Sequence, residues 1–242
     1  MQQALLELTD VHKSFGSFKV TDGISLSLNE GDALGIIGPN GAGKSTLFNL
    51  IAGGLKPDQG TVSFKGQDVT QHSVAQRCHQ GIGRSYQIPH PFGNMSVFEN
   101  LLVGAAFGTG RSEAECYDGC IEILARTGLL KKANKAAGSL TLLERKRLEM
   151  ARALATEPKL LLLDEIAGGL TEQECLELVG TIQEIHAAGT TIIWIEHIVH
   201  ALLSVVGRLM VIDFGKKLDE GEPQAVMGNP KVQEIYMGIS AE

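Results

Sequence analysis

The stretch that decides the fold of this 242-residue chain is Gly38-Pro39-Asn40-Gly41-Ala42-Gly43-Lys44-Ser45-Thr46, which directly follows the apolar run at residues 33–37. It fills every required position of the pattern G-x-x-x-x-G-K-[ST]. An apolar strand that leads into a glycine-rich loop and then a helix is typical of phosphate-binding loops. The stretch therefore predicts that the chain binds a nucleoside triphosphate.

Each residue type in this loop suits phosphate chemistry. The glycines allow backbone N–H groups to curl around the β-phosphate, because no side chain intrudes. Lys44 brings a positive charge toward the β- and γ-phosphates, the hydroxyl of Ser45 suits Mg²⁺, and the helix that begins near Lys44 directs its positive end at the anion. The predicted nucleotide-binding residues of the loop are Gly38, Asn40, Gly41, Ala42, Gly43, Lys44, Ser45 and Thr46.

Composition limits the possible functions. The formal net charge of −7 argues against nucleic-acid binding. Residues 1–7 lack the charged and long apolar segments of a signal peptide, and no uncharged apolar run reaches the length of a membrane span. We expect a cytoplasmic protein that meets the membrane only through a partner. Neither the four cysteines nor residues 196–200 have the spacing of a zinc site.

Short apolar runs alternate with helical patterns along the chain, as in parallel sheets with crossover helices. We expect antiparallel strands at residues 5–11, 19–28 and 61–64, and core strands at residues 33–37, 83–87, 160–164, 190–195 and 208–212. The predicted fold is an α/β P-loop NTPase core, a mixed sheet with flanking helices plus an antiparallel β portion.

Between residues 88 and 158 the character of the sequence changes. This stretch has no convincing strand but three helix capping boxes, and a fourth box begins another long helix beyond it. The four boxes are Ser96/Glu99, Ser112/Glu115, Thr141/Glu144 and Thr171/Glu174. We expect a mostly helical subdomain at 88–158, inserted within a single domain that spans residues 1–242.

Two adjacent carboxylates follow the buried run Leu160-Leu161-Leu162-Leu163. Asp164 can hold a hydrated Mg²⁺, which leaves Glu165 to orient or deprotonate the attacking water. Two acidic residues can also simply end a strand, but after a phosphate loop we favour the catalytic interpretation.

Three further residues fit a nucleotide site. His197 follows the apolar run at 191–195 and would emerge at the same sheet edge as Asp164, within reach of the γ-phosphate. Gln87 is expected to end a core strand, where it can bind Mg²⁺ or water. Phe15 offers a face on which adenine can stack. A structural histidine and a core phenylalanine are the alternatives for His197 and Phe15.

Taken in order, these motifs resemble the nucleotide-binding subunit of an ABC transporter. The resemblance rests on Phe15, the phosphate loop, Gln87, residues 144–154, residues 160–165 and His197, and covers essentially the whole chain. It implies hydrolysis of ATP with Mg²⁺, and a head-to-tail dimer in which each ATP lies between one phosphate loop and the other subunit's signature motif. It also implies that the helical subdomain grips a transmembrane permease, at the cytoplasmic face of the plasma (inner) membrane.

Within that family, several stretches resemble the ATP-binding subunits of branched-chain amino acid importers. They are Phe48-Asn49, residues 95–103, residues 147–152 and residues 234–238. This implies an importer for branched-chain or related amino acids, with a solute-binding protein as an indirect partner. Importers of amides, urea or polar amino acids share much of the same sequence. The transported substrate is not written in this chain, because an importer's specificity resides in its binding protein and permease, and the direction of transport follows only from the resemblance.

The signature motif departs from the family pattern. Where the family usually has Leu-Ser-Gly-Gly-Gln, this chain has Leu140-Thr141-Leu142-Leu143-Glu144. The leucines add bulk and Glu144 adds negative charge where the facing ATP should approach, although Thr141 keeps a hydroxyl. We therefore expect a heterodimer in which this chain's own catalytic site is competent, whereas its signature serves the partner's ATP poorly. Thr171 and Ile198 replace two frequent aspartates, which affects contacts across the dimer.

Two other functions remain as alternatives. A soluble ABC-type ATPase not coupled to transport usually has two cassettes or a long coiled-coil insertion, and neither is seen here. A P-loop kinase would need a site for an acceptor substrate and would not need His197 or the signature-like helix start.

Overall fold

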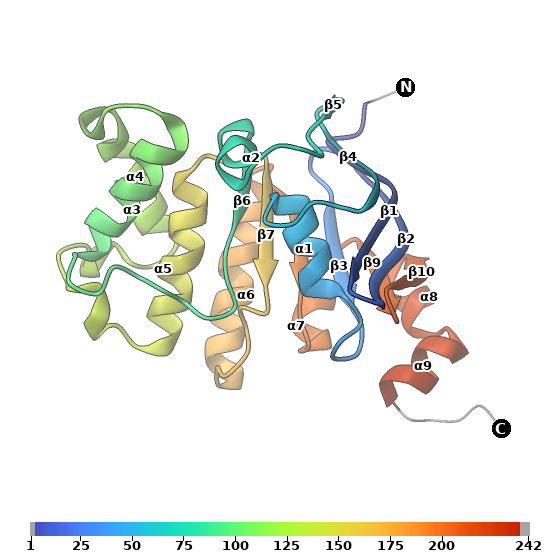
Figure 1. Cartoon of the computed structure of the whole chain (residues 1–242). Coiled ribbons are helices and arrows are strands. Elements are labelled where there is room, and N and C mark those ends of the chain that lie inside the picture. The colour runs from blue at the N-terminus through green and yellow to red at the C-terminus, as the bar shows by residue number, and fades with distance from the viewer. Residues whose placement is uncertain (1–2, 238–242) are drawn as a thin grey trace. The chain divides into compact units, whose positions relative to one another are not determined.

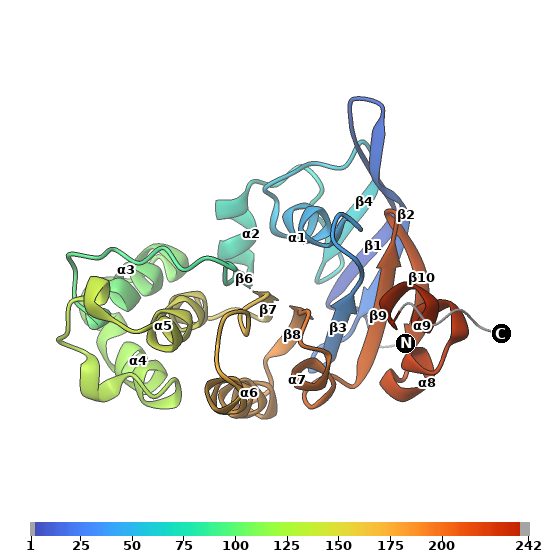
Figure 2. The ribbon, with the colours of Figure 1, turned by 90° about the horizontal axis from the view of Figure 1, so that it is seen from below.

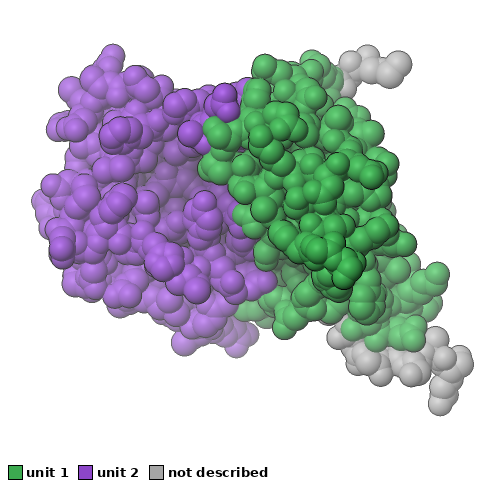
Figure 3. All heavy atoms as spheres, in the orientation of Figure 1, with its two compact units in different colours: residues 1–74, 193–242 green, residues 75–192 purple. Residues whose placement is uncertain are grey.

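The computed structural model describes residues 3–237. These residues form two compact units (Figure 3): the described part of unit 1 comprises residues 3–74 and 193–237, and unit 2 comprises residues 75–192. Met1 and Gln2 of the N-terminal stretch, and Gly238 at the end of the importer-like tail, lie outside the described residues.

Unit 1 contains the predicted antiparallel portion, a sheet with the strand order β2-β1-β4-β5. Its strands are β1 (Leu6–Phe15), β2 (Phe18–Leu28), β4 (Gln59–Phe64) and β5 (Gln67–Asp68). Leu6 pairs with Leu28 on one side and with Phe64 on the other, and all three are buried. β1 continues past its predicted end to Phe15 because the hairpin with β2 stays paired as far as Phe15 and Phe18.

A second group of strands in unit 1 carries the phosphate loop. β3 (Ala33–Ile37) is buried at every residue and pairs in parallel with β9 (Arg208–Asp213), which pairs antiparallel with β10 (Lys216–Gly221) (Figure 2). The sequence did not predict β10, because its residues are mostly charged. The helices of unit 1 are α1 (Lys44–Ala52), α7 (Val199–Leu203), α8 (Pro223–Met227) and α9 (Pro230–Met237).

Strand β8 (Thr191–Ile195) lies where the chain passes from unit 2 to unit 1. All five of its residues are buried, including Trp194, which is fully buried. Such a strand, apolar on both faces, is expected where a sheet is covered on both sides.

Unit 2 contains β6 (Ile82–Arg84) and β7 (Leu160–Asp164), which pair in parallel, with Arg84 opposite Leu162. β6 ends three residues earlier than expected, so the prediction that Gln87 ends a strand is wrong. The last ladder contact is the bond from the Ser85 N–H to the Leu162 carbonyl (2.9 Å). Helices α2 (Val74–Gln80), beginning at the edge of unit 1, and α6 (Glu172–Ala187) are the first and last helices here.

Between β6 and β7 the chain forms a helical cluster. Helices α3 (Val97–Thr109), α4 (Glu113–Arg126) and α5 (Leu142–Ala155) lie side by side in Figure 1, with short 3-10 turns at Leu130–Lys132 and Ala137–Ser139. Their shared apolar core includes Leu101, Leu124 and Leu148, all fully buried. The only β contact within this stretch of the described chain is an isolated bridge between Ser96 and Ala136.

The four predicted capping boxes all form. At Ser96, Thr141 and Thr171 the hydroxyl accepts the N–H three residues on, while the glutamate there accepts the N–H of the cap. At Ser112 the Glu115 carboxylate accepts both the backbone N–H and the hydroxyl. The local sequence thus fixes where these helices begin. In the part of the chain that the structure describes, no helix combines the length and apolar character needed to cross a membrane.

Candidate functional site

The phosphate loop follows β3 and leads into α1 in unit 1. A Cβ atom added at Gly38 would lie 2.1 Å from the Ile212 carbonyl oxygen, and one added at Gly43 would lie 2.3 Å from that of Val20. Gly43 also has a φ of 102°, which an L-residue rarely adopts. The glycines at 38 and 43 are therefore required by close backbone packing as well as by the approach of a phosphate.

Lys44 is folded into this loop. Its side chain is buried, and its Nζ donates to the carbonyls of Gly38 (2.7 Å) and Pro39 (3.0 Å). Among the described residues no side chain caps α1, and its first turn contains no acidic residue. The positive end of the helix and the lysine ammonium therefore face the same loop, which is the arrangement that binds phosphate. Ser45 is exposed at the start of α1.

His197 shares a pocket with the loop. Gly38, Pro39, Asn40, His197 and Ile235 line a cavity of about 230 Å³ in unit 1. The buried carboxylate of Glu196 accepts the N–H of His197 (2.9 Å), and so fixes the turn after β8. The side chain of His197 itself is exposed. Glu196 and Ile235 were not predicted at this site, because the sequence patterns in which they lie, at 196–200 and 234–238, do not point to phosphate binding.

Phe15 lies at the end of the β1–β2 hairpin with 51% of its surface exposed, which does not fit the alternative of a core phenylalanine. The hairpin is held by Asp58, whose carboxylate accepts from Lys13 Nζ and from the Ser14 N–H, each at 2.7 Å. The hydrogen bond from Lys13, followed by that from Ser14, lowers the pKa of Asp58. The ring of Phe15 is thus presented on an ordered strand, with Lys13 Nζ 5.8 Å from its centroid.

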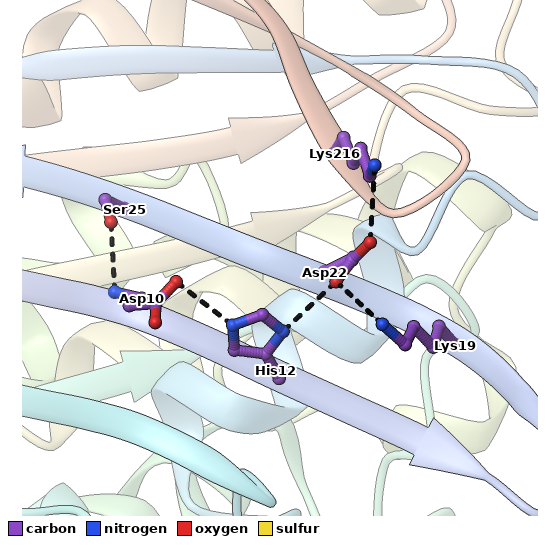
Figure 4. A network of polar contacts seen from close by, with 6 residues as sticks. All are labelled: Asp10, His12, Lys19, Asp22, Ser25 and Lys216. Carbon is purple, nitrogen blue, oxygen red and sulfur yellow. Dashed lines mark hydrogen bonds and ion pairs between the residues drawn. The ribbon is translucent and has the colours of Figure 1, made fainter.

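A polar network centred on His12 and Asp22 lies on the same hairpin (Figure 4). The ring of His12 lies between two carboxylates, with Nε2 3.0 Å from Asp10 and Nδ1 3.2 Å from Asp22. The N–H of Asp22 donates to the carbonyl of Gly215 (2.8 Å), and the N–H of Gly215 donates to Ala42 in the loop (3.1 Å). The hairpin that carries Phe15 and the phosphate loop are therefore joined by hydrogen bonds within unit 1.

The charge on Asp22 helps to hold this network together. Lys19 and Lys216 also contact its carboxylate (Figure 4). Burial works to raise the pKa of Asp22, but hydrogen bonds from the two lysines outweigh it and lower that pKa. Asp22 therefore stays ionised at neutral pH.

The two acidic residues after β7 are both engaged within unit 2. Arg84 Nη2 donates to Asp164 Oδ2 at 2.8 Å, and Gln87 Nε2 donates to Glu165 Oε2 at 2.5 Å. Glu165 has a φ of 46°, in the left-handed region that is costly for a residue other than glycine. The structure thus brings Gln87 and Glu165 together as neighbours, and adds Arg84, which the sequence analysis did not single out.

The signature segment forms the N-terminus of α5. Thr141 is the cap, Leu142 is 45% exposed and Leu143 is buried. The Glu144 carboxylate accepts the N–H of Thr141 (3.0 Å) and forms an ion pair with Lys132. The negative charge that we expected to face ATP is therefore partly neutralised by a neighbouring lysine.

The predicted magnesium ligands have suitable chemistry. The Ser45 hydroxyl, the Asp164 carboxylate and the Gln87 amide oxygen are the hard oxygen donors that Mg²⁺ prefers. The Asp164 carboxylate already has a cation, Arg84, beside it. By the chemistry of their donor atoms, Ser45, Gln87 and Asp164 are each suitable as magnesium ligands.

The chain is similar to known proteins along nearly its whole length. Residues 21–168 match the family model described as "ABC transporter". The chain is 37% identical to a probable branched-chain amino acid transport ATP-binding protein, LivG, of Methanocaldococcus jannaschii, with 97% of each chain covered. It is 35% identical to the high-affinity branched-chain amino acid transport protein LivG of Salmonella typhimurium, over 98% of this chain and 99% of the other.

Solved structures show the same fold. A nucleotide-free ATP-binding cassette from an ABC transporter superposes with a TM-score of 0.88 at 35% identity, over 98% of this chain and 100% of the other. The ADP conformation of an ATP-binding cassette gives a TM-score of 0.89 at 36% identity, with the same coverage.

Proposed function

The chain belongs to the ABC transporter family as an ATP-hydrolysing, nucleotide-binding subunit, and on that premise we propose that it powers the import of branched-chain or related amino acids. The observation that carries the nucleotide part is the phosphate loop, in which glycines without room for a Cβ surround the buried Lys44. The substrate class rests on relatives whose names specify branched-chain amino acid transport and that match along nearly their whole length. No relative among these supports an ATPase uncoupled from transport.

The chemistry we propose divides among three groups of residues. The loop at 38–46 binds the phosphates, with Lys44 compensating their charge, while Phe15 stacks on the base. Glu165 accepts a proton from the attacking water, and His197 hydrogen-bonds the γ-phosphate. Bound Mg²⁺, held by Ser45, Gln87 and Asp164, would supply further charge neutralisation at the phosphates.

The partners we propose follow from the same family. The helical subdomain at 88–158 contacts a membrane permease, and a solute-binding protein delivers the amino acid to that permease. The chain is peripheral to the membrane, and we place it at the cytoplasmic face of the inner membrane. Closure of two ATPase subunits around ATP, followed by release of products, would drive the permease.

Substitution of the base tests the mechanism. Glu165→Gln should lower multiple-turnover hydrolysis by about two to four orders of magnitude, since it removes a general base, while binding of a nonhydrolysable ATP analogue persists. Glu122→Gln, at an exposed position on α4, is the matched control and should hydrolyse ATP at the normal rate. Hydrolysis near the normal rate in Glu165→Gln would show that another group is the base.

The proposals about the dimer and the transported substrate can be tested only in the assembled complex. We propose that this chain pairs with a second ATPase subunit that has an ordinary signature motif. The mixed complex should then hydrolyse ATP faster than the purified chain alone, and equal turnover would contradict the heterodimer. In the reconstituted complex with its binding protein, ATP hydrolysis is measured with different amino acids, and the one that stimulates hydrolysis is the transported substrate.

A further inference from the structure

Residues 84–87 contact both acidic residues of the proposed catalytic site. Arg84 and Gln87 lie three residues apart, and they engage Asp164 and Glu165 respectively. We propose that Arg84 is the resting counter-ion of Asp164, that magnesium–nucleotide binding displaces it, and that Arg84 thereby sets the magnesium affinity of the site. This inference rests on the proposed function, which makes Asp164 a magnesium ligand.

The sheet register creates the ion pair. Arg84 ends β6 and lies opposite Leu162 of the parallel strand β7, so the side chains of Arg84 and Asp164 emerge at the same carboxyl edge. Their side chains are only 10% and 8% exposed, and the N–O distance is 2.8 Å. A guanidinium does not lose its proton in proteins. The negative charge of the Asp164 carboxylate is therefore neutralised for as long as the ion pair persists.

Two cations compete for this carboxylate. An arginine and a divalent metal ion beside the same oxygens repel each other, and burial strengthens that repulsion. Binding of Mg²⁺ to Asp164 must therefore weaken or break the contact with Arg84. The free energy lost in breaking it is subtracted from the affinity for Mg²⁺.

The structure also provides a place for the released guanidinium. Arg84 Cζ lies 4.9 Å from the ring centroid of Tyr86, which is 48% exposed. A guanidinium can remain stacked on an aromatic face after it leaves a carboxylate. Movement of Arg84 along this ring would shift the same segment that carries Gln87. Release of Asp164 and release of Glu165 are thus coupled through four consecutive residues.

The test is a calorimetric titration with Mg²⁺ of the full chain, in the presence of a saturating nonhydrolysable ATP analogue. Arg84→Met removes the charge but keeps most of the side-chain volume. It should lower the half-saturating Mg²⁺ concentration by about tenfold, within the range of coupling between two sites on one protein. Arg147→Met is the matched control, because Arg147 also forms an ion pair in unit 2, with Glu177 (3.1 Å). It should leave the Mg²⁺ midpoint unchanged.

A second measurement does not depend on catalysis. Without Mg²⁺ and nucleotide, Arg84→Met should unfold at a lower temperature than the unsubstituted chain, because Asp164 is left buried without this partner. With both ligands present, that difference should shrink. If Arg84→Met does not fold, Arg84→Gln carries the same expectations, and Arg84→Lys, which keeps the charge, should retain the ordinary Mg²⁺ midpoint.

Asp164→Asn separates failure of this inference from failure of the proposed function. It should raise the Mg²⁺ midpoint. An unchanged midpoint in Asp164→Asn would remove Asp164 from the metal site, and the role of Arg84 with it. A raised midpoint in Asp164→Asn, combined with an unchanged or raised midpoint in Arg84→Met and Arg84→Gln, would overturn the role of Arg84 alone.

Discussion

Helices α1 and α5 both begin at motifs that this family uses around ATP, yet their first turns are built differently. α1 begins after Gly43, and among the described residues its first turn contains no acidic side chain and no side-chain cap. α5 begins after Thr141 with a complete capping box, and its Glu144 carboxylate also pairs with Lys132. Both helix ends carry the same partial positive charge from the backbone.

The difference shows how one helix end is left for a ligand and the other is stabilised internally. In α5 a carboxylate already sits where an external anion would gain most, so the attraction for a phosphate is reduced. In α1 this attraction remains, and the loop is held by close backbone packing against Val20 and Ile212 instead. If this contrast holds, substitution at the uncapped start of α1 should have a larger effect than substitution at the capped start of α5.

Gly43→Ala should disrupt the open end of α1. Its Cβ would lie 2.3 Å from the Val20 carbonyl oxygen at a φ of 102°, so we expect a loss of about 3–5 kcal/mol in the free energy of unfolding, together with loss of ATP binding. Denaturant unfolding and binding of an ATP analogue measure the two effects.

Gly41→Ala is the matched control for Gly43→Ala. Gly41 also has a positive φ, 81°, but nothing lies within 4 Å of its added Cβ. We expect about 1–2 kcal/mol from backbone strain alone. Equal losses in the two variants would mean that close packing does not explain the requirement for glycine at 43.

Thr141→Ala should weaken the closed end of α5. Loss of the cap should lower the free energy of unfolding by about 1 kcal/mol, and Ser96→Ala in α3 should cost about the same, because the two capping boxes are alike. In the mixed ATPase complex, only Thr141→Ala should also slow hydrolysis, by roughly twofold to fivefold, the value of one hydrogen bond. Identical turnover in both variants would indicate that Thr141 serves only as a cap.

The loss of stability at acid pH should depend on the glutamates that complete the capping boxes of α3, α4 and α6. Hydrogen bonds from the capping residues Ser96, Ser112 and Thr171 lower the pKa values of Glu99, Glu115 and Glu174 below 4.5. Their stabilising effect is therefore present above the unfolded value and is lost as the pH falls through the lowered values.

Denaturant midpoints measured between about pH 6 and about pH 3 test this, with the triple variant Glu99→Gln, Glu115→Gln, Glu174→Gln as comparison. The triple variant should lose less stability on acidification. Glu149 acts in the opposite sense: burial raises its pKa, so its contribution is present below 4.5 and is lost as the pH rises through the raised value. If the triple variant loses as much stability on acidification as the unsubstituted chain, the capping carboxylates do not cause that loss.

The features that sequence predicted well are those determined over a few residues. The phosphate loop, the buried run before Asp164 and the capping boxes each depend on local spacing, and they lie where the sequence placed them. The contact between Arg84 and Asp164 joins residues 80 positions apart and depends on the register of two strands. The sequence alone does not fix that register.

The same reason explains the other differences. β6 ends at Arg84, three residues before Gln87, because pairing with β7 stops there. β10 forms although its residues are mostly polar, because β9 supplies its hydrogen bonds. His12 attracts no notice in the sequence, since Asp10 and Asp22 meet it only when β1 and β2 pair.

Trp194 gives the folded chain a single tryptophan fluorophore. It is the one tryptophan in the sequence, its side chain is fully buried in β8, and among residues 3–237 its indole N–H has no hydrogen-bond partner. Emission from a ring so shielded from water should be blue-shifted while the sheet is intact and should move to longer wavelength when water enters. Since β8 leads directly to Glu196 and His197, this optical signal reports on the strand that supports the proposed γ-phosphate contact, without any attached label.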